Sequence, residues 1–171
     1  MIYEPREDSF LLEIEVKKYS KGKKVLDVGS GSGILAKAAL YSGAKEVLCV
    51  DINNECVKYL KKEGFKAIQS DLFSNVKGKF DLIVFNPPYL PEDEREDNES
   101  SIITSGGKKG NEIIIRFLKE SLNHLEENGI ILIVVSNLTG KINFKKFGFK
   151  MRIIASKKIF MEKLEVWELR K

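Results

Sequence analysis

The sequence predicts an α/β fold: a mostly parallel β-sheet with helices on both faces, ending in an antiparallel hairpin. Three observations lead to this prediction. Short apolar runs alternate with segments of helical periodicity along most of the chain. A glycine-rich loop follows the first apolar run, as in the opening strand, loop and helix of many α/β folds. Two strand-like segments end the chain with few residues between them, which is typical of a hairpin.

The first half of the chain predicts one leading helix and then four strands. Residues 7–19 have apolar residues at helical spacing, and Asp8 or Ser9 is suited to cap this helix. The elements expected next are a strand at 24–27, a helix at 34–41, a strand at 46–50, a helix at 54–63 and strands at 66–69 and 80–85. Asn53 or Asn54 is suited to cap the second of these helices.

The second half predicts a long amphipathic helix and three further strands. The helix covers residues 111–125 and is closed by Asn128-Gly129. Residues 130–135 form an uninterrupted apolar run, which is typical of a central strand buried on both faces. A short helix at 139–147 and strands at 150–156 and 163–170 complete the chain. Because there is no internal repeat or linker, residues 1–171 are expected to form a single domain.

Cysteine content and hydropathy limit the class of protein. The chain has two cysteines, Cys49 and Cys56, and one histidine, His124, which do not make a plausible zinc site. We therefore expect no metal site and two free thiols in a reducing cytosol. The N-terminus lacks a signal-peptide pattern, and no apolar run approaches the ~20 residues of a membrane span. The sequence thus predicts a soluble cytoplasmic protein.

The charges are unevenly spread along the chain. The net charge is +4, but residues 92–99 hold six acidic residues and one arginine, so the rest of the chain is more basic than the total indicates. This acidic run follows Tyr89 within a few residues. It would repel a phosphate backbone there, which counts against a nucleic-acid substrate.

The four residues Asn86-Pro87-Pro88-Tyr89 directly follow the strand at 80–85. Two prolines continue neither a sheet ladder nor a helix, so the chain leaves its strand along a fixed, extended path. This path holds a side-chain amide, a backbone carbonyl and an aromatic ring at a strand end, where open α/β sheets bind their ligands. Such a cluster suits a planar substrate that carries an NH2 group. An ordinary proline-rich turn is the alternative that the tetrapeptide alone leaves open.

The glycine-rich loop and the acid before it indicate a cofactor without phosphates. Gly29, Gly31 and Gly33 let the backbone turn tightly beside a helix N-terminus. A pyrophosphate fingerprint has its third glycine one place later, where this chain has Ile34. Asp27, just before the loop, would oppose a phosphate but favour a cation.

Two further acids end the next two strands. Asp51 lies about where a ribose-diol acceptor is found in such folds, and Asp71 is suited to an exocyclic amine. Three acids around a glycine loop predict a positively charged cofactor that carries adenosine, a description that S-adenosylmethionine matches and that NAD and ATP do not. For any single aspartate, a capping or solvated role remains open.

Four segments resemble those of a known family. The family motif Y-E-P-x-E-D-T is similar to the N-terminal segment Tyr3-Glu4-Pro5-Arg6-Glu7-Asp8-Ser9, and its cofactor loop is similar to Asp27-Val28-Gly29-Ser30-Gly31-Ser32-Gly33. The motif G-G-x-x-G-x-E is similar to Gly106-Gly107-Lys108-Lys109-Gly110-Asn111-Glu112. The closing strand of the family is similar to Glu162-Lys163-Leu164. On these segments the chain resembles class I S-adenosylmethionine-dependent methyltransferases. It is most similar to the short archaeal and eukaryotic branch of the HemK-type protein-glutamine methyltransferases, which modify the GGQ glutamine of translation release factors.

Two positions depart from that pattern. Ser9 stands where threonine is usual, and Ile103-Thr104-Ser105 replaces a tryptophan-containing stretch. The Asn-Pro-Pro-Tyr motif is shared with adenine-N6 and other amino-group methyltransferases, so the N-terminal motif makes the narrower choice of glutamine.

The resemblance implies a Rossmann-like class I methyltransferase fold with a seven-stranded sheet. Its cofactor site implies contacts from Tyr3, Pro5, Asp8, Ser9, Asp27, Gly29, Gly31, Gly33, Asp51, Ile52, Asp71, Leu72 and Asn86, with residues 1–20 covering the cofactor. It also implies a small zinc-binding activator along the edge strand at 66–69, where Phe65, Ala67 and Ile68 would supply apolar surface. A short edge protected by lysines is the alternative.

We expect Asn86, Pro87 and Tyr89 to be the catalytic residues. Asn86 Oδ1 and the Pro87 carbonyl would each accept one N–H of the substrate amide, and Tyr89 would cover the amide plane. No base is required before methyl transfer. The competing interpretations are an adenine-N6 methyltransferase acting on DNA or RNA, which the lysines between 141 and 158 favour, a non-catalytic binding protein, and a nicotinamide dehydrogenase.

Overall fold

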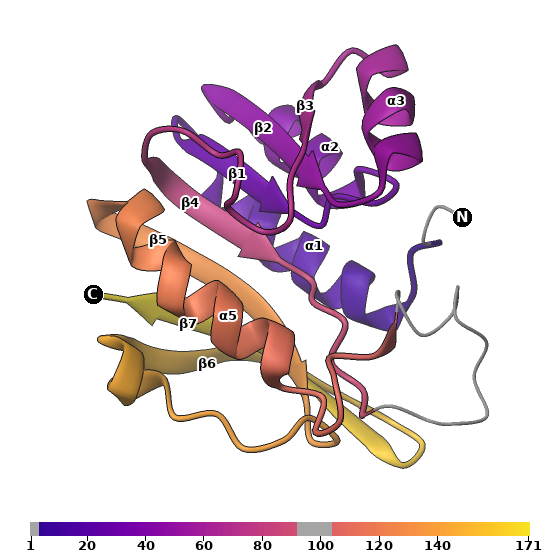
Figure 1. Ribbon diagram of the computed structural model, residues 1–171, viewed down its shortest axis with the longest axis vertical. Helices are drawn as coiled ribbons and strands as arrows, with labels where there is room; N and C mark the ends of the chain where they lie inside the picture. The colour runs from indigo at the N-terminus through magenta and orange to yellow at the C-terminus, as the bar shows by residue number, and fades with distance from the viewer. Residues whose placement is uncertain (1–3, 92–103) are drawn as a thin grey trace.

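The computed structural model describes residues 4–91 and 104–171, and these form an α/β fold with one seven-stranded sheet (Figure 1). The strands are β1 (Lys24–Val28), β2 (Glu46–Asp51), β3 (Lys66–Gln69), β4 (Phe80–Phe85), β5 (Leu125–Ser136), β6 (Lys150–Ile159) and β7 (Glu162–Arg170). The helices are α1 (Glu7–Tyr19), α2 (Ile34–Tyr41), α3 (Asn54–Lys62) and α5 (Glu112–Ser121), with short 3-10 helices η1 (Leu122–His124) and η2 (Phe144–Phe147).

The order of the strands brings the predicted site residues to one edge of the sheet. The order is β3-β2-β1-β4-β5-β7-β6, in which β3, β2, β1, β4 and β5 are parallel and the last two strands are antiparallel. The predicted fold class is therefore confirmed, as is the position of β3 at the sheet edge. Because parallel strands end at the same edge, the loops after β1, β2, β3 and β4 lie together there.

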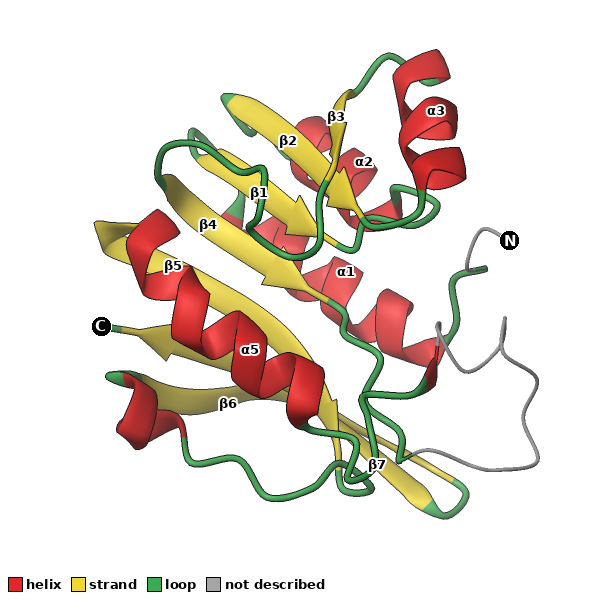
Figure 2. Cartoon of the chain, viewed as in Figure 1, coloured by secondary structure: helices red, strands yellow, loops and turns green. Residues whose placement is uncertain are grey.

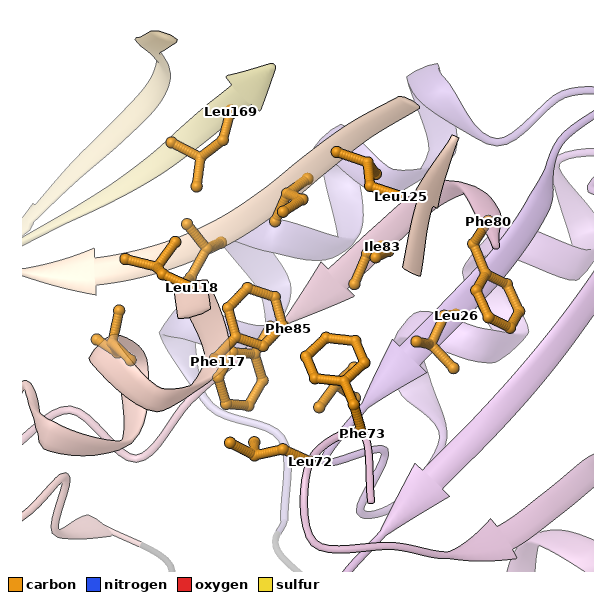
Figure 3. Close-up of a cluster of buried hydrophobic side chains, with 14 of the residues drawn as sticks. Leu26, Leu72, Phe73, Phe80, Ile83, Phe85, Phe117, Leu118, Leu125 and Leu169 are labelled. Carbon is orange, nitrogen blue, oxygen red and sulfur yellow. The ribbon is translucent and has the colours of Figure 1, made fainter. Parts of the chain in front are cut away.

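Helices cover both faces of the sheet (Figure 2). On one face, α5 places Phe117 and Leu118 against the sheet, and the rings of Phe117 and Phe85 stack at 4.5 Å between centroids (Figure 3). On the other face, α1, α2 and α3 enclose a second core around Leu12, Leu35 and Leu60. The central strand β5 contributes alternate residues to both cores, which explains its uninterrupted apolar run.

The helix predicted over 111–125 and closed by Asn128-Gly129 was wrong at its C-terminal end. Helix α5 ends at Ser121, η1 follows, and β5 begins at Leu125. Leu125 is fully buried and pairs with Phe80 of β4. This pairing, with a register shift before Leu82, takes Leu125 into the sheet although it lies within the predicted helix.

The helix predicted over 139–147 was also mostly wrong, because only η2 (Phe144–Phe147) is helical. The backbone before η2 is engaged by another segment. Gly140 donates its N–H to the carbonyl of Lys109 at 2.9 Å, and Asn111 donates a side-chain N–H to the carbonyl of Lys141 at 2.9 Å. These contacts use groups that a helix would need for itself.

The predicted helix caps had mixed outcomes. Asn53 caps α3 as expected, since its side chain accepts the N–H of Glu55 at 2.9 Å. Neither Asp8 nor Ser9 caps α1, whose N-cap position is Arg6.

Cys49 and Cys56 are buried free thiols, as expected. Within the described ranges, no helix has the length and apolar character needed to cross a membrane.

Candidate active site

The loop between β1 and α2 has the tight backbone that its glycines predict. Gly29, Gly31 and Gly33 all have positive φ angles, of 63°, 50° and 76°. A Cβ at Gly33 would also lie 2.6 Å from the side chain of Leu60. Ser30 fixes the loop to β2, because its N–H donates to the carbonyl of Val50 at 3.0 Å.

Asp27 is a fully buried acid at the start of this loop. Its Oδ2 accepts the N–H of Ala36 at 3.1 Å, whereas Oδ1 has no hydrogen-bond partner in the described part of the chain. Burial raises the pKa of Asp27 to about 8, and the nearby carboxylate of Asp51 adds to the increase. Asp27 therefore has one carboxyl oxygen without a partner at the place predicted for a cationic cofactor.

Asp51 ends β2 and connects it to the glycine loop. Its Oδ2 accepts the N–H of Gly31 at 2.9 Å and its Oδ1 accepts the N–H of Asn53 at 2.8 Å. Burial raises the pKa of Asp51, and these two hydrogen bonds oppose the increase. Each oxygen still has a second lone pair, which can accept a hydroxyl group of a ligand. The next residue, Ile52, is 58% exposed.

Asp71 lies beyond the end of β3, but its carboxylate has a partner that the sequence did not reveal. Arg116 of α5 forms an ion pair with it at 2.8 Å, and both side chains are about half exposed. Leu72 follows with a positive φ of 48° and is buried. The structure thus places a cation beside one of the three predicted acids.

The first turn of α1 contacts the loop formed by residues 86–89, called here the NPPY loop. Asn86 Nδ2 donates to Ser9 Oγ at 3.1 Å, and the Tyr89 hydroxyl donates to Asp8 Oδ2 at 3.2 Å. Asp8 and Ser9, predicted as cofactor contacts, are therefore brought against two predicted catalytic residues. The fold thus brings an N-terminal motif into contact with a motif about eighty residues later in the chain.

Two acceptors of the NPPY loop have no donor among the residues that the structure describes. Asn86 Oδ1 is buried and lacks a hydrogen-bond partner among residues 4–91 and 104–171. In the same ranges, the carbonyl of Pro87 receives no hydrogen bond either. A buried acceptor without a donor costs free energy, so Asn86 Oδ1 is suited to accept an N–H group of a ligand, and the Pro87 carbonyl is available to accept a second one.

A glycine-rich segment, residues 106–110, packs its main chain against the main chain of the NPPY loop. Gly106 donates its N–H to the carbonyl of Leu90 at 2.8 Å. A Cβ at Gly106 would lie 2.7 Å from the carbonyl oxygen of Pro88, and one at Gly110 would lie 2.5 Å from that of Tyr89. Only glycine permits this approach of two backbones.

Sequence reasoning missed Thr139 and Arg116. Thr139 Oγ1 donates to the carbonyl of Tyr89 at 3.2 Å and so connects the loop after β5 to the site.

Tyr3 and the acidic run at 92–99 lie outside the described residues. Pro5 lines a hollow of about 420 Å³ together with Ser32 of the glycine loop, and a second hollow of about 690 Å³ lies between η2 and the end of β5. Neither hollow is lined by Asn86 or Asp51.

Known proteins are similar to this chain in sequence. Residues 8–161 match the family model of the methyltransferase small domain. A relative from Methanocaldococcus jannaschii, to which protein N5-glutamine methyltransferase activity is provisionally assigned, is 45% identical over 98% of this chain and 92% of its own length. The release factor glutamine methyltransferase of Aquifex aeolicus is 36% identical over 68% of this chain and 47% of its own length.

A solved structure extends the likeness to the whole fold. It is a chain of the E. cuniculi Mtq2–Trm112 complex, which is responsible for methylation of the eRF1 translation termination factor. That chain superposes with a TM-score of 0.79 at 26% identity, and the match covers 99% of this chain and 98% of that chain.

Proposed function

This chain belongs to the methyltransferase small-domain family, and from that premise we propose that it methylates the side-chain amide nitrogen of the GGQ glutamine in a translation release factor, with S-adenosylmethionine as the methyl donor. One observation carries the proposal. Asn86 Oδ1 is a buried acceptor without a donor in the described part of the chain, and it lies directly after β4. A substrate that acts in translation would place the enzyme in the cytoplasm.

The NPPY loop would act by holding the amide nitrogen. A carboxamide nitrogen is a poor nucleophile, because its lone pair is shared with the carbonyl group. Asn86 Oδ1 and the Pro87 carbonyl would each accept one N–H, which fixes the nitrogen and favours the partial positive charge that develops on it. The bond from Asn86 Nδ2 to Ser9 turns Oδ1, and not Nδ2, toward the substrate. The surplus proton leaves to water after transfer.

Tyr89 and Asp8 would complete the acceptor site. The bond from the Tyr89 hydroxyl to Asp8 limits rotation of the ring, so that its face can cover the amide plane. Ser9 and Asp8 would therefore be positioning residues, and residues 1–20 would also cover the cofactor, with Tyr3 and Pro5 in contact with it.

The residues of the glycine loop fit S-adenosylmethionine, which would supply a methyl group activated by a sulfonium cation. Asp27 Oδ1 is buried and has no donor within the described ranges, so it suits a cationic ligand or the water bound to it. Asp51 would accept the ribose hydroxyls. Ile52, Asp71 and Leu72 would contact the adenine, with the Asp71 carboxylate shared with Arg116.

Cofactor affinity is expected to depend on pH through Asp27. The free protein holds a proton on Asp27 up to its pKa of about 8. A bound cation favours the ionised carboxylate, so binding releases this proton, and affinity rises with pH below 8 and levels above it. Calorimetry in two buffers of different ionisation enthalpy measures the proton release.

The matched control is Asp27→Asn, which keeps the shape of the side chain. It should remove the part of the pH dependence that belongs to Asp27, and what remains comes from Asp51 or from the cofactor. Equal proton release by the variant and the native protein would show that Asp27 stays protonated in the complex.

A small zinc-binding partner protein is proposed to pair with β3. The similar chain from E. cuniculi is found in a two-protein complex, and an edge strand can accept a strand or loop of another protein. Phe65 and Ile68 are partly buried and remain accessible there, but Ala67 is only 4% exposed, so its expected share of the apolar surface was wrong.

Methyl transfer from labelled cofactor tests the function. The acceptors are a release factor, its GGQ→GGA variant and an adenine-containing duplex, each with and without the candidate partner. We expect label on the native release factor alone. Label on the duplex alone would contradict the proposal in favour of adenine methylation, and full activity of the chain by itself would contradict the need for a partner.

A further inference from the structure

The β6–β7 hairpin extends beyond the sheet at the edge that carries the candidate site. Ser136, the last residue of β5, pairs with Leu164 of β7, and from there β6 and β7 pair only with each other until Ile159 meets Glu162. The turn at Phe160 and Met161 therefore lies three to four residues past the end of β5, or about 10 Å at the rise of a strand. Figure 1 shows this projection as the yellow hairpin end at the lower right of the view.

The turn, called here the hairpin tip, consists of two large apolar residues that are almost fully solvated. Phe160 is 96% exposed and Met161 is 79% exposed. Phe160 also has a φ of +35°, in the region where a tight turn favours glycine or asparagine and disfavours a bulky residue. Burial in a core and the preferences of tight turns both fail to explain why two large apolar residues occupy this turn.

The paired strands next to the tip, called here the stem, also hold an unfavourable arrangement, in this case of two positive charges. Lys158 and Lys163 are directly paired across the two strands, an arrangement that is unfavourable for like charges. Lys163 has Glu165 as an ion-pair partner at 2.6 Å, whereas Lys158 has none within residues 4–91 and 104–171. An apolar tip above a basic stem complements an apolar depression with an acidic rim.

The hairpin is held in place relative to the NPPY loop. Lys157 forms an ion pair with Glu7, the neighbour of Asp8, whose carboxylate accepts the Tyr89 hydroxyl. At the base of the hairpin, Lys163 donates its N–H to Asn137 Oδ1 at 2.6 Å. The hairpin below the tip is therefore linked, through Glu7, to the turn of α1 that contacts the NPPY loop.

We propose that Phe160 and Met161 dock the folded release factor while its glutamine loop enters the site at Asn86. This inference rests on the proposed function. The position of the tip beyond the sheet edge lets it reach parts of a folded substrate that a short peptide lacks. The surface that it contacts on the substrate is an apolar depression bordered by acidic side chains.

The double variant Phe160→Ser, Met161→Ser tests this docking contact. For the intact release factor, KM should rise about tenfold or more, because burial of two apolar side chains is lost. The kcat should stay unchanged, and both constants should be unchanged for a synthetic peptide that carries the GGQ loop. Leu40→Ser is the matched control, since Leu40 is 48% exposed near the C-terminal end of α2, away from the site edge.

The outcomes separate the docking contact from the function. An unchanged KM for the intact factor, or an equal loss on factor and peptide, overturns the docking contact alone. If the native chain methylates neither acceptor in the presence of the candidate partner, the proposed function fails and the docking contact fails with it. If the double variant loses binding to an RNA oligonucleotide in a gel shift and keeps its KM for the factor, the tip is an RNA contact and the proposal is wrong.

Discussion

Replacement of Asn86 by alanine should lower kcat for glutamine methylation by at least about 10²-fold, the effect of removing one positioned hydrogen-bonding group from a transition state. The variant loses Oδ1, a buried acceptor that has no donor among the described residues, and also the hydrogen bond from Nδ2 to Ser9. Cofactor affinity, measured by calorimetry, should stay nearly unchanged. Single-turnover kinetics with the release factor measures the loss.

Two further variants make this test specific. Ser9→Ala keeps Asn86 Oδ1 but removes the bond that orients it, so we expect a smaller loss, about tenfold, that Ser9→Thr restores. Asn143→Ala removes another asparagine, whose side chain accepts the N–H of Lys146 away from the site, and turnover should not change. Turnover by Asn86→Ala at the native rate would remove Asn86 from the catalytic residues.

Replacement of Asp51 by alanine should weaken cofactor binding by roughly 1.5–3 kcal/mol, the contribution of a hydrogen bond to a charged group. This corresponds to about a 10- to 150-fold higher Kd. The variant also removes the acceptor for the N–H of Gly31, which holds the glycine loop against β2. Calorimetric titration with the cofactor measures the change directly.

Asp81→Ala controls for the loss of a buried backbone contact. Asp81 Oδ2 accepts the N–H of Lys24 at 2.8 Å, so this variant also removes a carboxylate bonded to a main-chain donor. Because Asp81 and Lys24 lie at the beginnings of their strands, at the opposite edge of the sheet, cofactor affinity should not change. Equal Kd values for Asp51→Ala and the native chain would exclude Asp51 from the cofactor site.

Local patterns predicted the parts of the fold that local interactions decide. The strand at 66–69, the strand at 80–85 and the Asn53 cap were confirmed, because each depends on its own apolar run or side chain. The helix expected over 111–125 failed at Leu125, which pairs with a strand more than forty residues earlier in the chain. Periodicity contains no information about such a partner.

The same distinction holds in the candidate site. The ends of β1, β2 and β4 could be placed from sequence, because loops after parallel strands share one edge. The bonds from Asn86 to Ser9 and from Tyr89 to Asp8 could not, since they join segments separated by about eighty residues. The pair of Arg116 with Asp71 leaves no sequence signal, because one charged residue on an amphipathic helix resembles any other.

The glycines that pack against the NPPY loop determine which substitutions this region can accept in evolution. At Gly106 and Gly110 the loop rests on main-chain atoms, and main-chain atoms are the same whatever side chains surround them. Variation in the neighbouring residues therefore leaves the position of the methyl acceptor untouched, while the two glycines themselves have no substitute. A lineage can alter the surface that selects a protein substrate without rebuilding the chemistry beneath it.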